Sequence, residues 1–391
     1  MKTRVIPQST CGEGFSARKA RHEQPPALPG IHRTPTQTTR GRRSAALRSW
    51  WVGLLVLLFA ADAHASHFRY GHNTWRRIGG TTVEFTSTQA WRSSFLDMLC
   101  ISPGDGSSCR VGTITDIGTF TDLSGNQFTI RQYTFQHTYP GNGPFTAVAQ
   151  SCCRIGDLVN AGDASERIET VVNLDAANQG SPVSSIPVIL QMVQGGLNSV
   201  ALPISDPDGD PISCRMATFA ESEIPAVAAA GGHSVSVSPA CVLSWDTSGT
   251  VAGQKYAVQV VIEEDHVGTS SKVALDFIVE IVDGTLNNSP ECTGTSGTHV
   301  VNVGHSFVAN FTGTDIDGDA LTLNHLGLPP GATLTPAAGT TSAQPFASQF
   351  AWTPQPSDAG SARAVTVVYQ DPAGLQDTCS LSLRVPLCGD G

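Results

Sequence analysis

Residues 205–212 read Ser-Asp-Pro-Asp-Gly-Asp-Pro-Ile, and residues 314–321 repeat the pattern as Thr-Asp-Ile-Asp-Gly-Asp-Ala-Leu, 109 residues further along the chain. In both places three aspartates occupy every second position, a glycine bends the segment, and an apolar run follows. A motif of this length that recurs with its flanking run indicates two copies of one domain.

Other matching segments support this duplication. They keep the same order at an offset that drifts from 107 to 104 residues: residues 243–245 with 350–352, 258–262 with 365–369, and 275–281 with 379–385. Apolar side chains alternate with polar or mixed ones in these runs, which is the pattern of strands with one buried face. About seven such runs per copy predict a β-sandwich. We expect Trp245 and Trp352 in the two cores, because burial is the commoner outcome for a lone tryptophan of a strand.

The composition agrees with an all-β fold. The 391 residues include 39 Gly and 24 Pro, and only 14% are charged, which excludes a coiled coil or helical bundle. Apolar residues make up 40% of the chain, which excludes wholesale disorder. They occur as short Val/Ile/Leu/Thr runs between Gly, Pro, Asn and Asp, so many short strands are expected.

The second copy, residues 286–386, resembles the cadherin-like, immunoglobulin-type modules of bacterial secreted and surface proteins. The resemblance rests on the aspartate motif and the strand after it, on Gly-Leu-Pro-Pro-Gly at residues 327–331 and on Phe-Ala-Trp-Thr-Pro at residues 350–354. The first copy, residues 181–285, matches more loosely. The resemblance implies tandem Ig-like or cadherin-like sandwiches with a structural or adhesive role, rigidified by calcium.

The aspartate motifs predict calcium sites. Three carboxylates at alternate positions of a bent loop can turn towards one hard cation, and Ca²⁺ accepts about six to eight oxygen ligands in irregular geometry. The predicted ligands are Asp206, Asp208 and Asp210 in the first copy, and Asp315, Asp317 and Asp319 in the second. Additional oxygens are expected from Asp265, or its neighbours Glu263 and Glu264, and from Asp371. Metal-free turns are the alternative, because Asp and Gly also favour turns.

The junction between the copies, residues 283–290, resembles the cadherin interdomain linker. In that linker Asp and Asn oxygens bridge two domains through calcium, which implies that Asp283 and Asn287 are ligands here.

Ten cysteines indicate an oxidising compartment. Two fall in each copy, and we predict the bridges Cys214–Cys241 and Cys292–Cys379; the first and last strands of a sandwich can lie close enough for the second. Cys152 and Cys153 are adjacent. Neighbouring side chains of a strand point to opposite faces, so we expect them to pair with Cys100 and Cys109, with a strained vicinal ring as the alternative.

Residues 1–65 resemble an export signal with an extended basic start. Arg42, Arg43 and Arg48 precede the apolar run 50–61, which is too short to span a bilayer stably, and Ala63-His64-Ala65 is a small-residue cleavage site. Cleavage before Ser66 leaves 13 basic and 30 acidic residues, a net charge near −17. Such a charge disfavours nucleic-acid binding and favours cations. The tail, residues 387–391, resembles the opening of a cysteine-rich repeat of myxobacterial surface proteins, which implies a truncated product; a natural terminus is the alternative.

Residues 66–180 form a further β-rich domain outside the repeat, with strands expected near residues 81–86, 128–135 and 145–149. No hydrolase, nucleotide-binding or metalloprotease motif occurs, so we predict no enzyme. The sequence favours a secreted or cell-surface calcium-binding protein with a structural or adhesive role and an extracellular protein or glycan ligand, and it offers no evident small-molecule substrate. The alternative is a carbohydrate-binding or hydrolytic accessory protein that uses exposed aromatics such as Trp75 and Trp91.

Overall fold

The structure, a computed structural model, describes residues 67–95, 98–175, 178–225, 234–266, 269–285 and 287–387. The predicted signal peptide, the expected first residue Ser66 and the tail cysteine Cys388 lie outside these ranges. The described chain is nearly all β, and its regular helical elements are the short α2 (Phe219–Ser222) and the 3-10 turn η2 (Pro356–Asp358). Within the described ranges no helix combines the length and apolarity that a bilayer crossing needs.

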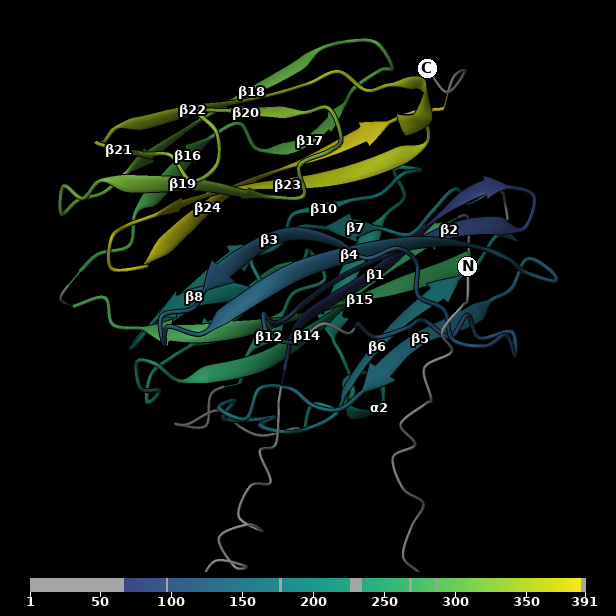
Figure 1. The fold of residues 1–391 in the computed structure, drawn as a ribbon, viewed down its shortest axis with the longest axis horizontal. Helices are drawn as coiled ribbons and strands as arrows, with labels where there is room; N and C mark the ends of the chain where they lie inside the picture. The colour runs from purple at the N-terminus through teal and green to yellow at the C-terminus, as the bar shows by residue number, and fades with distance from the viewer. Residues whose placement is uncertain are drawn as a thin grey trace, which may run out of the picture. The chain divides into compact units, whose positions relative to one another are not determined.

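The second copy is a sandwich of two sheets, seen as two layers in Figure 1. One sheet has the order β16 (Glu291–Gly294), β18 (Phe307–Thr314), β22 (Phe346–Trp352), β20 (Thr333–Thr335). The other has the order β17 (Gly297–Val300), β24 (Gln376–Val385), β23 (Ser361–Gln370), β19 (Leu321–Leu326), β21 (Thr341–Ser342). Buried and exposed residues alternate along β22, and Trp352 is 2% exposed in the core between the sheets. The predicted sandwich and its core tryptophan are therefore present.

The first copy repeats this plan. One layer has the order β12 (Ser236–Val237), β13 (Val242–Asp246), β9 (Leu197–Ala201); the opposite layer contains β11 (Ile212–Met216), β14 (Lys255–His266), β15 (Thr269–Val282) and β8 (Ile189–Val193). The short strands β7 (Val183–Ser184) and β10 (Ile204–Ser205) pair with each other. Trp245 packs edge-on against Tyr256 with ring centroids 4.8 Å apart. In both copies an apolar strand pair, β14–β15 or β23–β24, carries the core.

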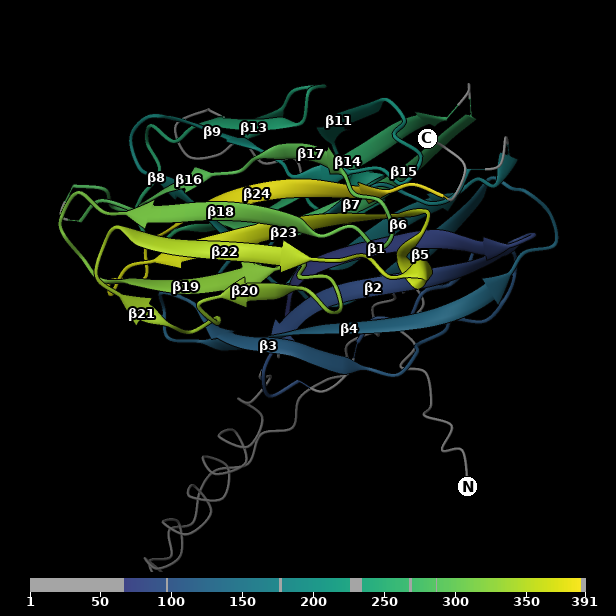
Figure 2. The same ribbon diagram turned by 90° about the horizontal axis from the view of Figure 1, so that it is seen from above.

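Strands of residues 66–180 continue the sheet of the first copy. They are β1 (Phe68–Gly79), β2 (Thr82–Arg92), β3 (Thr115–Thr121), β4 (Gln127–Thr138), β5 (Phe145–Ser151) and β6 (Glu166–Val172). β1 and β6 both pair with β15, and the main path of the sheet then runs through β2 and β4 to β3 (Figure 2). Strand pairing thus continues across the boundary expected after residue 180, because β15 is long enough to hold neighbours from both segments.

The aromatic residues of the N-terminal domain form a core of their own. Trp75 and Trp91 are each 2% exposed, and the Trp91 ring packs edge-on against Phe68. The expectation that these tryptophans are exposed for ligand stacking is wrong, because both belong to an apolar cluster that also contains buried residues of β5 and β6.

The described ranges contain four disulfides. Cys214–Cys241 and Cys292–Cys379 have the predicted pairing. The expected cross-pairing of the N-terminal cysteines is wrong: Cys100 pairs with Cys109, and Cys152 with Cys153. Cys100 and Cys109 flank the backbone bridge between Ile101 and Arg110, which brings their Cα atoms to 5.5 Å, within the usual bridging range. The adjacent cysteines are left with each other.

Candidate metal centres

The loop of residues 206–210 is organised by one carboxylate. Asp206 Oδ1 accepts the backbone N–H groups of Asp208 and Asp210 at 2.9 and 3.0 Å, and Gly209 supplies the left-handed conformation with φ +79°. Asp206 is 5% exposed, and its Oδ2 has no hydrogen-bond partner among the described residues. Asp206 Oδ2 is therefore a buried acceptor that is open to a further hydrogen-bond donor or a cation.

Glu264 lies beside that oxygen. The residue is near the end of β14, is 2% exposed, and its Oε2 also has no partner within the described ranges. Burial raises the pKa of Glu264, and the nearby Asp206 carboxylate raises it further; burial likewise raises the pKa of Asp206. Two ionised carboxylates cannot hydrogen-bond to each other, so this pair needs a proton or a cation between its oxygens.

Of the three acidic residues expected to add ligands to the first copy, Glu264 lies at the aspartate loop, whereas its neighbours Glu263 and Asp265 do not. Asp265 is exposed, and Glu263 instead accepts a hydrogen bond from Arg215 Nε at 2.9 Å. Successive side chains of a strand alternate between faces, so Glu264 and His266 share the face from which Asp265 is excluded. His266 is 8% exposed, and its Nδ1 lies 2.5 Å from Asp210 Oδ2.

We define the first cluster as Asp206, Asp208, Asp210, Glu264 and His266. The segment that enters the first copy contacts this cluster. Asn178 Nδ2 donates to Glu264 Oε1 at 2.5 Å, and the Gln179 backbone N–H donates to Asp208 Oδ2 at 2.8 Å. The ligand atoms of Asp208, Asp210 and His266 lie within 4.8 Å of one another.

The second cluster, Asp315, Asp317, Asp319 and Asp371, has the same construction. Asp315 Oδ1 accepts the Asp317 N–H at 2.8 Å, while Asp315 Oδ2 is buried with no partner in the described chain. Asp371, 4% exposed at the end of β23, brings its carboxylate within 4.8 Å of those of Asp315 and Asp319. Burial raises the pKa of Asp371.

The linker before the second copy contacts the second cluster as the earlier segment contacts the first. Asn287 Nδ2 donates to Asp371 Oδ2 at 2.5 Å, and the Asn288 backbone N–H donates to Asp317 Oδ2 at 2.6 Å. Asp283 does not reach the cluster: it is exposed and accepts hydrogen bonds from Thr285 N and Oγ1, which lower its pKa. Asn287 is thus brought to the site, and Asp283 is not.

Both clusters fit a divalent cation. Each has a fixed loop carboxylate with a buried oxygen that lacks a donor, a second buried carboxylate from a strand end, and two further aspartates. Oxygen ligands of this kind suit Ca²⁺. Such a cation would supply the positive charge that the described protein groups do not give to Asp206 Oδ2 and Asp315 Oδ2.

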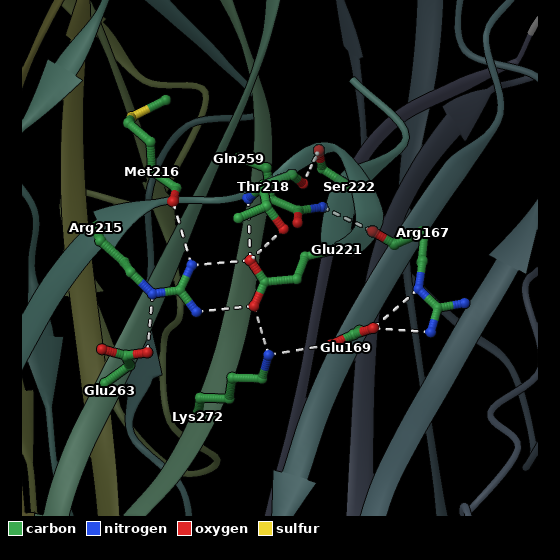
Figure 3. A network of polar contacts seen from close by, with 10 residues as sticks. All are labelled: Arg167, Glu169, Arg215, Met216, Thr218, Glu221, Ser222, Gln259, Glu263 and Lys272. Atoms are coloured by element: carbon green, nitrogen blue, oxygen red, sulfur yellow. Dashed lines mark hydrogen bonds and ion pairs between the residues drawn. The ribbon is translucent and has the colours of Figure 1, made fainter. Parts of the chain in front are cut away.

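A third polar cluster is structural (Figure 3). Glu221 of α2 lies between Arg215 and Lys272, accepting hydrogen bonds from Arg215 Nη1 and Nη2 at 2.8 Å and from Lys272 Nζ at 2.5 Å. Lys272 also reaches Glu169, and Arg215 reaches Glu263. Arg167 pairs with Glu169 as well, so three positive groups face three negative ones. This network therefore holds α2 on the sheet and has no surplus charge with which to attract an ion.

Comparison with known proteins points to one group. The family model described as "Integrin beta-like protein A-E, N-terminal" matches residues 69–175. Integrin beta-like protein C of Dictyostelium discoideum is 27% identical over 410 residues, covering 88% of this chain and 20% of the relative. Integrin beta-like protein A of the same organism is 27% identical over 298 residues, covering 68% and 14%. The chain spans a fifth or less of the length of these relatives.

Solved structures of immunoglobulin domains also match. The N-terminal Ig1-2 module of the Drosophila receptor protein tyrosine phosphatase DLAR is 15% identical with a TM-score of 0.21, covering 53% of this chain and 99% of that one. The eight N-terminal Ig domains of DSCAM are 14% identical with a TM-score of 0.19, covering 81% and 37%. At these TM-scores the Ig-like sandwich assignment rests on the paired sheets of the chain itself. The finer resemblance to bacterial cadherin-like repeats stays a prediction.

Proposed function

We propose that this chain is a structural, adhesive component of the cell exterior in which calcium ties each sandwich to the segment that enters it. The main support is that the segment entering each copy contacts the aspartate cluster of that copy in the same way. An asparagine side chain donates to the carboxylate at the strand end, Asn178 to Glu264 and Asn287 to Asp371. The next backbone amide, of Gln179 or Asn288, donates to a loop aspartate. A cation bound to the same carboxylates would stiffen the entry to each sandwich.

An exterior location and an adhesive role are supported by three features. Four disulfides lie in the part of the chain that the structure describes, the sequence has a predicted export signal, and the relatives are named integrin beta-like proteins. The partner in this proposal is an extracellular protein or glycan. The burial of Trp75 and Trp91 removes the aromatic surface on which the carbohydrate-binding alternative was based.

The test is calcium-dependent stability of the full chain. Binding to the folded state alone stabilises by RT ln(1 + [L]/Kd), about 2.7 kcal/mol per site at a hundredfold excess over Kd. Extracellular modules bind with Kd of about 0.1 to 1 mM, so millimolar calcium should raise the melting temperature and chelator should reverse the rise.

Matched variants locate the effect. Asp315→Asn keeps the acceptor for the Asp317 amide but removes the charge, so it should abolish the calcium response of the second copy. Asp283→Asn, on an exposed residue outside both clusters, should leave the response intact. A melting curve indifferent to calcium and to chelator would mean that the motifs are turns only.

A further inference from the structure

The two clusters differ in one donor atom. In the first, His266 ends β14 and directs Nδ1 at Asp210 Oδ2, 2.5 Å away. The repeat relates Glu264 to Asp371 at an offset of 107 residues, and the same offset places Ala373 at the position of His266. The compact group in the second cluster, Asp315, Asp319 and Asp371, offers oxygen only.

Donor type separates divalent cations. Imidazole nitrogen suits Zn²⁺, Ni²⁺ and Cu²⁺, whereas Ca²⁺ is bound by oxygen. We propose that the first cluster binds a transition-metal ion of the zinc class through His266 Nδ1 and the carboxylates of Asp208 and Asp210, while the second cluster keeps calcium. This inference rests on the proposed cation-binding role of the clusters, and it replaces calcium by a transition-metal ion at the first cluster only.

The geometry permits such a site. Ligand atoms about 2.0 to 2.2 Å from a tetrahedral zinc ion lie about 3.3 to 3.6 Å apart. Those of Asp208, Asp210 and His266 lie within 4.8 Å of one another, and His266 Nδ1 is 2.5 Å from Asp210 Oδ2, so side-chain rotations that move these atoms by about 1 Å would bring the three to zinc-binding separations. His266 is 8% exposed, which keeps its ring in a defined position.

An independent observation marks the same place as a cation site. Asp206 and Glu264 are 5% and 2% exposed, and each has a carboxylate oxygen without a partner in the described chain. Asp206 holds the amides of Asp208 and Asp210, and Glu264 shares a strand face with His266, so both residues belong to the same cluster as the three proposed ligands. A cation beside them would give both oxygens a partner, which the His266–Asp210 hydrogen bond does not.

The experiment is competition dialysis of the full chain, stripped with chelator and equilibrated with zinc chloride in millimolar calcium chloride. We expect one zinc ion per chain to be retained against calcium, and His266→Asn to weaken its binding at least about tenfold. His305→Ala, on an exposed histidine of the second copy, should leave zinc binding unchanged.

Cobalt(II) provides a readout that does not depend on a variant folding. A nitrogen-containing, low-coordinate site should give the unmodified chain a visible absorption band that zinc displaces and calcium does not. No such band, or equal zinc retention in folded His266→Asn, overturns the inference. If the chain does not retain zinc but calcium still raises its melting temperature, the zinc inference fails and the proposed function stands. If the chain retains zinc but calcium does not change its melting temperature, the proposed calcium binding fails and the zinc inference stands.

Discussion

The two copies of the sandwich differ in what pairs with their last strand. In the second copy β24 has 10 residues, and β17 pairs in parallel with its residues 381–384 within a sheet of five strands. In the first copy β15 has 14 residues; β8 takes the equivalent parallel position at residues 278–282, and the rest of that edge pairs with β1 and β6. One fold is thus closed in one copy and open to added strands in the other, although β24 contains residues 376–380, the equivalents of the β15 residues 272–276 that pair with β1 and β6.

The added strands bring buried charge with them. Asp276 on β15 is 0% exposed and receives Arg154 Nη1 and Nη2 at 2.7 and 2.6 Å from the N-terminal domain. At the repeat offset of 104 residues the second copy has Ser380, whose hydroxyl meets Thr366 Oγ1 at 2.8 Å. The open copy therefore depends on an ion pair where the closed one has a neutral hydrogen bond.

The largest expected effect separates the copies by their disulfides. Cys292–Cys379 spans 87 residues and Cys214–Cys241 spans 27. In the chain-entropy model these loops stabilise by about 4.6 and 3.6 kcal/mol. Replacing each pair by serine should lower the urea midpoint in that order. The reverse order would show that the shared sheet of the first copy makes its bridge more important than loop length predicts.

The buried ion pair gives the next comparison. Asp276→Ala leaves the Arg154 charge buried without its partner, so we expect a loss of about 3 kcal/mol or more. Ser380→Ala, the matched change in the second copy, should cost only about 1 kcal/mol. Urea unfolding of both variants measures the difference. Equal losses would mean that the Arg154 charge at the junction is compensated by another group, such as the nearby carboxyl of Glu166.

How far the sequence predicts this structure can be argued from β14. Alternating apolar residues predict the strand, and the same alternation continues through Val258, Val260 and Ile262 to Glu264 and His266. Extended to the end of the strand, this alternation places Glu264, and not Asp265, on the buried face beside the aspartate loop. The repeat offset of 109 residues likewise relates Asn178 to Asn287, so the sequence also contains the correspondence between the two entering segments.

The long-range pairing of strands and cysteines cannot be read from the sequence in this way. An edge of β15 offers backbone N–H and C=O groups whatever its side chains are, so the sequence does not show that β1 pairs there rather than elsewhere. The pairing of Cys100 with Cys109 depends on the bridge between Ile101 and Arg110, which also forms from backbone groups. Local pattern thus predicts strands and cores, and long-range backbone pairing decides how they join.

A pH dependence should distinguish the open copy. Glu166, at the start of β6, is 0% exposed; burial raises its pKa to about 8, the nearby Arg154 charge opposes the rise and Asp276 adds to it. Between about pH 4.5 and 8 the folded chain holds a proton that the unfolded chain releases, so stability falls as pH rises, by at most about 1.4 kcal/mol per pH unit. Glu166→Gln should flatten this slope in urea unfolding followed across that range. Glu291→Gln, exposed on β16 of the second copy, is the control, and an unchanged slope in Glu166→Gln would refute the assignment.

The smallest effect concerns the helix α2, where the second copy has its Gly-Leu-Pro-Pro-Gly loop. Hydrogen bonds from Arg215 hold the pKa of Glu221 well below its usual range, with Lys272 adding to the effect, so its stabilisation is present above about pH 4.5 and lost as pH falls further. Because the network is partly exposed, we expect Glu221→Gln to cost about 1 kcal/mol at pH 7. Thermal unfolding should show that the cost of Glu221→Gln becomes smaller towards pH 3, the opposite direction to the effect at Glu166.

The control is Glu263→Gln. It removes a single contact to Arg215 Nε from a carboxylate that is 38% exposed, and should cost less than half as much. If both substitutions cost the same, Glu221 does not hold α2 on the sheet, and the first copy would tolerate the loop of the second in its place.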